Sequence, residues 1–330
     1  MLPLRRSLPR GRRELLRQAV SAGAETGSGE RGQRSRRSVL ARAAMRRRDT
    51  MARRAVSATG EGHIARPEEG PVARVGEPAL PALGVVLLNR AGFGPRPGEL
   101  EQFTALGATD AERLQAWVDQ QLDPAILDDS EADARVAASG YTTLGKTLTQ
   151  LWADHVVPDE LPWQDRIRPI AETELVTFLR GVYSRRQLFE VMTEFWHNHF
   201  SVYGWESYEA ATWVHYDRDV IRGNALGNFR QMLEAVAKST PMLLYLDNWL
   251  SSQDGPNENY ARELLELHTL GDDNYFGTVP RSEVPVDGNG IQVGFVDEDV
   301  FAVTRCLTGW SLDGDPWWDL TSGNGGYYYR

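Results

Sequence analysis

The residues best placed to do chemistry are Glu194 and His197, three positions apart in the stretch MTEFWHNHFSV. On a helix this spacing places both side chains on one face, where a carboxylate and an imidazole can bind the same metal ion. Glu190 lies on that face one turn earlier and offers a third ligand. The pattern predicts a site for one divalent metal ion held by Glu190, Glu194 and His197. The alternative is a polar helix face that contacts only solvent.

His199 falls on another stripe of the same helix, with the apolar residues Leu188, Met192 and Phe195. This position predicts a buried imidazole, which needs a hydrogen-bond partner. The polar start of a second stretch, NENYARELLELHTLG at residues 257–271, offers such partners. We expect the two stretches to pack together as a cluster for proton transfer or for binding one metal ion. The candidate catalytic residues are Glu194, His197, His199, Asn257, Glu258 and Glu263. The alternative is a lock of buried hydrogen bonds with no catalytic role.

The second stretch carries the end signals of a short helix. Pro256 stands at a first helical position, which tolerates the missing N–H, and Gly271 stands where a left-handed residue is favoured. Tyr260, Leu264 and Leu267 recur at helical spacing and predict its buried stripe.

The surrounding pattern is also helical. Thr109 and Glu112 have the spacing of a capping box, and Asn228 is a second helix cap. A helix opened by Pro169 carries Leu175, Phe178, Leu179 and Val182. A last helix, capped by Asp297, directs Val300, Val303 and Leu307 inward. DGNG at residues 287–290 predicts a small hairpin or an inserted loop. Without an alternating βαβ pattern, the sequence predicts a mainly α, multi-helical globular domain.

Charge divides the chain of 330 residues into two parts. Residues 1–66 hold 17 arginines and five acidic residues, a net charge of +12, which leaves −22 for the remainder because the whole chain carries −10. We expect residues 1–80 to be a disordered Arg-rich tail ahead of a helical domain at 81–330. The acidic charge of the domain argues against nucleic acid as a partner, except through the basic tail. The single cysteine, Cys306, excludes an internal disulfide and a cysteine metal site.

The tail also bears on localisation. SRRSVLA, at residues 35–41, resembles a twin-arginine export motif, but arginines follow where an export signal needs an apolar segment. The sequence therefore favours a cytoplasmic protein, with export as the alternative. No run of eighteen apolar residues predicts a transmembrane segment.

Several blocks, in order, resemble a bacterial family known as domain of unknown function 1800. Besides the two stretches above, these are LLNRAGFGP (87–95), IRGNALGNFRQML (221–233), PMLLYLDN (241–248) and LTGW (307–310). The resemblance implies no particular reaction. It also implies that related chains continue past LTGW into a segment with a His-Asp pair, so we expect this chain to end inside its domain. Val300, Val303 and Leu307 would then form an exposed face for self-association or a protein partner.

Two functions follow from these patterns. The first is a hydrolase-like or single-metal enzyme that uses the Glu/His/Asn cluster. The second is a non-catalytic structural or partner-binding module, whose cluster is a lock of buried hydrogen bonds.

Overall fold

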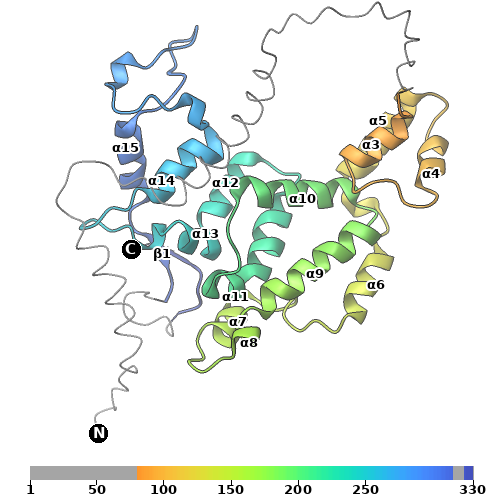
Figure 1. The fold of residues 1–330 in the computed structure, drawn as a ribbon, viewed down its shortest axis with the longest axis horizontal. Coiled ribbons are helices and arrows are strands. Elements are labelled where there is room, and N and C mark those ends of the chain that lie inside the picture. The colour runs from red at the N-terminus through yellow and green to blue at the C-terminus, as the bar shows by residue number, and fades with distance from the viewer. Residues whose placement is uncertain (1–79, 315–322, 330) are drawn as a thin grey trace, which may run out of the picture. The chain divides into compact units, whose positions relative to one another are not determined.

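The computed structural model describes residues 80–314 and 323–329, and it is mainly helical as predicted (Figure 1). Most of the predicted tail, residues 1–79 including SRRSVLA, lies outside the described residues. In chain order the α-helices are α3 (Leu83–Arg90), α4 (Glu99–Ala105), α5 (Asp110–Leu122), α6 (Ser130–Ala138), α7 (Leu148–His155), α8 (Trp163–Arg166), α9 (Arg168–Tyr183), α10 (Gln187–Phe200), α11 (Ser207–His215), α12 (Phe229–Ala237), α13 (Thr240–Tyr245), α14 (Asn259–Glu263) and α15 (Asp297–Leu307).

Two of these helices continue directly into wider turns. The π-helical turn η2 (Tyr216–Ile221) follows α11 and leads into the 3-10 turn η3 (Arg222–Asn224). The π-helical turn η5 (Leu264–Thr269) follows α14. Because a π turn closes hydrogen bonds to the fifth residue, it shifts the side chains beyond it out of α-helical phase.

Two of the predicted caps form, whereas Asp297 is the first residue of α15 and follows its N-cap, Val296. The Thr109 hydroxyl accepts from the Glu112 amide at 3.3 Å, and the Glu112 carboxylate accepts from the Thr109 amide at 2.9 Å. The Asn228 side chain accepts from the amides of Arg230 and Gln231 at the start of α12. These bonds satisfy N–H groups that have no partner inside the helix, so local sequence alone sets these two helix starts.

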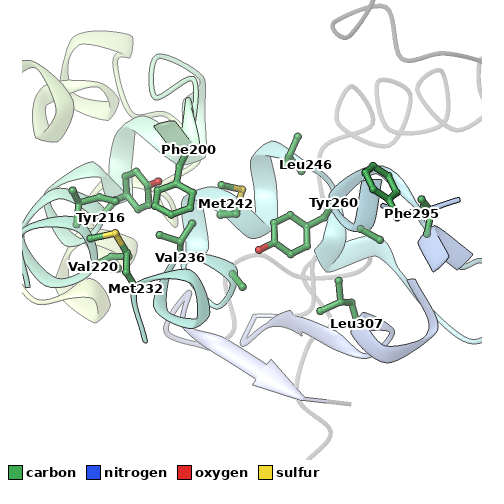
Figure 2. Close-up of a cluster of buried hydrophobic side chains, with 14 residues drawn as sticks. Phe200, Tyr216, Val220, Met232, Val236, Met242, Leu246, Tyr260, Phe295 and Leu307 are labelled. Atoms are coloured by element: carbon green, nitrogen blue, oxygen red, sulfur yellow. The ribbon is translucent and has the colours of Figure 1, made fainter. Parts of the chain in front are cut away.

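One cluster of buried apolar side chains contains residues from both sequence stretches that resemble the family, 192–202 and 257–271 (Figure 2). We call these the two family stretches. It draws on α10, η2, α12, α13, α14 and α15. Val300 and Leu307 are buried in it and Val303 packs against it, so the expectation of an exposed face at these three residues is wrong. Other members are Phe200, Tyr216, Met232, Val236, Met242, Tyr260 and Phe295.

The strands are short. β1 (Trp310–Leu312) pairs antiparallel with β2 (Tyr327–Tyr329), in a register that sets Ser311 opposite Tyr328. Residues 287–290 form a loop closed by one antiparallel bridge between Val286 and Gln292, and Gly290 takes a positive φ of 76° there. None of the described helices combines the length and apolar character needed to cross a bilayer.

Three helices carry the site. α9 packs against both α10 and α11 (Figure 1), and η2 and η3 continue from α11 toward α10 and α12. The apolar residues Leu175, Phe178 and Val182 of α9 are exposed. The buried side of α9 consists of Ile170, Glu172, Thr173 and Val176.

Candidate functional site

Helix α10 buries its polar side. Gln187, Glu190, Thr193 and Phe200 are its buried residues, whereas Phe195 is 52 % exposed. The predicted apolar stripe of Leu188, Met192, Phe195 and His199 is therefore not the core-facing stripe. The reason is a partner that helical periodicity does not reveal: an arginine, Arg222, that neutralises Glu190 inside the protein.

A chain of charged groups runs through this interior. Arg222 Nη1 and Nη2 donate to the two Glu190 carboxylate oxygens at 3.0 and 2.6 Å. Arg222 Nε donates to Asp217 Oδ2 at 2.9 Å. The other Asp217 oxygen, Oδ1, lies 3.0 Å from His197 Nε2. Glu190, Arg222, Asp217 and His197 thus form one connected network, in which only His197 is substantially exposed.

The network fixes the ionisation of its members. Burial opposes the charge on Asp217, but His197 and Arg222 outweigh it and lower the pKa of this carboxyl to about 2. Burial likewise disfavours the charge on Arg222, while Asp217 and Glu190 raise its pKa above the usual range. Asp217 is consequently an anion at neutral pH, and its Oδ1 accepts a hydrogen bond from the Nε2–H of His197.

Aromatic rings hold the imidazole in place. Trp213 stacks on His197 with ring centroids 5.6 Å apart, and Tyr216 meets it edge-on at 5.4 Å. No described residue forms a hydrogen bond with the other ring nitrogen, Nδ1. The hydrogen bond to Asp217 keeps the hydrogen of the neutral imidazole on Nε2. Nδ1 then carries the lone pair that can accept a proton.

His197 borders a cleft of about 460 Å³ between α9, α10 and α11. This volume is in the range of small-molecule and substrate sites. The lining includes all four network residues, and polar side chains surround them. These are Thr173, Glu174, Thr177, Thr193, Glu194, Asn198 and Ser201.

The predicted metal ligands are only partly brought together. Glu190, Glu194 and His197 line the same cleft, but both Glu190 oxygens are bound by Arg222 and His197 Nε2 faces Asp217. Glu194 is exposed. Within the described part of the chain, no group of three or more His, Cys, Asp or Glu residues is arranged to hold a metal ion.

The two family stretches do meet, at a different point from the one expected. His199 is partly buried, and its Nε2 lies 3.2 Å from the backbone oxygen of His268 in η5. Its partner is thus not in Asn257–Glu263. His268 itself is buried beside His199, Phe200 and Tyr260.

The remaining candidates lie outside the cleft. Asn257 caps its own turn, accepting from the Asn259 amide, and donates to the Asp247 carbonyl. Glu258 pairs with Arg262, and Glu263 is buried in α14. None of these three lines the cleft. Asp217 and Arg222 were missed, although the acidic–basic run YDRDVIR at residues 216–222 was the available signal.

The second stretch differs in its helix phase too. α14 begins at Asn259, so Pro256 precedes the helix, while Gly271 has the expected positive φ of 89°. Tyr260 is buried, but Leu267 is 54 % exposed because η5 shifts the phase and turns Glu266 and His268 inward.

Comparison with known proteins adds the family. Residues 86–330 match the family model described as protein of unknown function (DUF1800), which confirms the resemblance seen in the sequence blocks. The match covers well over half of the chain, and the chain belongs to this family. No curated protein and no solved structure gave a match.

Proposed function

We propose that this member of the DUF1800 family is a hydrolase in which His197 is the general base and Asp217 positions it. The observation that carries the proposal is the 3.0 Å contact between His197 Nε2 and Asp217 Oδ1 at the wall of a cleft. A carboxylate that holds one imidazole nitrogen protonated leaves the other as a base, an arrangement found in many hydrolytic sites.

The chemistry needs only groups that line the cleft. His197 Nδ1 takes a proton from a water molecule as the water oxygen attacks an acyl carbon, and the bond to the leaving group breaks. The same imidazole then returns the proton to the leaving group. Asn198 supplies an amide donor for the developing oxyanion.

Asp217 contributes by staying ionised. Because the pKa of Asp217 is lowered to about 2, its negative charge persists across the neutral range and stabilises the imidazolium that forms during the reaction. Glu190 has no direct part in this scheme. Its role is to hold Arg222, which in turn fixes Asp217.

A non-catalytic role remains the second candidate, and one observation favours it. Glu190, Arg222 and Asp217 are all buried, and they tie α10 to η2 and η3 as a structural lock would. In that case His197 is simply the solvent-side end of the lock.

The experiment is hydrolysis of a panel of chromogenic aryl esters and aryl amides by the purified chain. We expect His197→Gln and Asp217→Asn to lower the rate by about 10²- to 10⁴-fold. His215→Gln is the matched control, because His215 forms a second His-Asp contact, 2.9 Å to Asp219, outside the cleft.

The control should leave the rate unchanged. A folded wild-type chain without turnover on the whole panel, or a His197→Gln variant with the wild-type rate, would contradict the hydrolase and favour the lock.

A further inference from the structure

An apolar stripe on α9 runs beside the cleft. Leu175, Phe178 and Val182 are 51, 74 and 55 % exposed, and their spacing of three and four residues places them on one helix face. Phe93, itself 48 % exposed, lies against Gly181 and extends the apolar area. We call Leu175, Phe178 and Val182 the α9 stripe. A contiguous exposed apolar area of this kind marks a binding surface more often than isolated exposed residues do.

The stripe and the cleft share a residue. Phe178 belongs to the stripe and also lines the cleft, where Glu174 from α9 and Glu194 from α10 stand beside it. Phe178 therefore connects the stripe to the cleft.

The charge at this edge is not neutralised. Glu174 accepts a hydrogen bond from the Trp205 indole N–H at 2.7 Å, and Glu194 is exposed. Neither has a Lys or Arg partner among the described residues, whereas Arg222 neutralises Glu190 and Asp217 deeper in the cleft. Two carboxylates without a cationic partner, beside an apolar stripe, attract cations and repel anions.

We propose that the α9 stripe and the cleft bind a basic, amphipathic peptide segment, which is the substrate. Its apolar side chains cover Leu175, Phe178 and Val182, and a Lys or Arg side chain reaches Glu174 and Glu194. The stem of that side chain lies over the Phe178 ring. This assignment rests on the proposed function, because the peptide bond is then the acyl group beside His197. The C–N bond breaks, and water supplies OH to the acyl carbon and H to the amine.

The test is fluorescence anisotropy with a labelled synthetic peptide that carries leucines at helical spacing and lysines on the neighbouring face. The control peptide has glutamate in place of lysine. We expect Phe178→Ser to weaken binding at least about tenfold and Glu194→Gln about two- to fivefold. The matched variants are Leu122→Ser and Glu298→Gln, which change exposed residues elsewhere and should bind like the wild type.

His197→Gln separates this proposal from the proposed function. Binding that persists in His197→Gln, without peptide cleavage by the wild type, supports the docking site and contradicts the hydrolase. Equal binding of the two peptides, or no effect of Phe178→Ser, overturns the docking proposal while the ester assay stands by itself. Concentration-dependent dimerisation that Phe178→Ser abolishes assigns the stripe to a second copy and also overturns it.

Discussion

Arg222 donates hydrogen bonds from Nη1 and Nη2 to the two carboxylate oxygens of Glu190, at 3.0 and 2.6 Å. Each of the two side chains is over nine-tenths buried. Burying such an ion pair costs free energy, because both charges lose their water, and removing one partner destabilises the fold further by leaving an unpaired buried charge. Since Arg222 also forms an ion pair with Asp217, it is the central residue of the site.

Removing Arg222 should therefore cost more than removing Glu190. Arg222→Met leaves two buried carboxylates without the cation that donates hydrogen bonds to them, and we expect a loss of about 3–5 kcal/mol in the free energy of unfolding. Glu190→Gln keeps the contact of Arg222 with Asp217 and should cost about 1–3 kcal/mol. Urea denaturation measures both. Glu131→Gln, which breaks an exposed pair with Arg135, is the control and should stay within about 0.5 kcal/mol. Equal losses for Arg222→Met and Glu190→Gln would contradict the central position of Arg222.

His268 should make stability depend on pH. Burial, and after it the nearby His199, lowers the pKa of His268 from 6.5 to about 4, against the effect of a hydrogen bond with the Phe200 backbone. Between these two values the unfolded chain binds more protons than the folded one. The free energy of unfolding should thus fall as the pH drops from 6.5 to about 4, by about 3 kcal/mol in total.

The variant His268→Phe should flatten this part of the profile, as followed by denaturation at each pH. Below about pH 3.8 a further loss should remain in the variant, because protonation of Asp217 destabilises the fold as the pH approaches about 2. An unchanged slope in His268→Phe would assign the pH dependence to other groups.

Two tyrosines should respond in opposite ways to loss of the hydroxyl. The Tyr260 hydroxyl is buried and has no hydrogen-bond partner among the described residues, whereas the Tyr275 hydroxyl donates to Asp297. We expect Tyr260→Phe to raise the free energy of unfolding by about 1 kcal/mol and Tyr275→Phe to lower it by a similar amount. Thermal unfolding of the two variants compares them directly. A loss in Tyr260→Phe as large as that in Tyr275→Phe would mean that the hydroxyl is hydrogen-bonded in solution.

Gly204 should be intolerant of a side chain. A Cβ there would lie 2.5 Å from the Trp213 ring and 2.7 Å from Ile170, and Trp213 stacks on His197. Gly204→Ala should cost about 1–3 kcal/mol and displace the imidazole. Gly223→Ala is the control, since its nearest neighbour is 3.9 Å away. Chemical shifts of the His197 ring and urea denaturation report the two effects. If Gly204→Ala matches the control in both, Trp213 does not position His197.

Signals that act within one turn of helix were readable from the sequence. The caps at Thr109 and Asn228 and the left-handed Gly271 depend on neighbouring backbone groups, and the structure confirms them. Glu194 and His197 both line the cleft for a similar reason, since their spacing places them on one face of α10.

The residues that bind Glu190 and His197 could not be predicted from local sequence in the same way. Asp217 and Arg222 lie 20 and 32 residues from the groups they bind, and only tertiary packing brings them together. Because Arg222 neutralises Glu190, the polar side of α10 faces inward, which hydrophobic periodicity assigns to solvent. The changes of helical phase at η2 and η5 could not be predicted from the sequence either, since no residue type marks a π turn.

The π turn η5 makes this part of the chain sensitive to residue count. Such a turn holds about one residue more than an α-helical turn, so deleting a single residue from Leu264–Thr269 would let α14 continue in regular phase. The residues after the deletion would rotate by about 100°, and His268 would leave the core for solvent. Conservative substitutions at Leu264–Leu267 keep the number of residues ahead of His268, whereas the loss of any one of these four positions changes the direction of the imidazole. The number of residues in this turn therefore matters for the contact between His199 and His268.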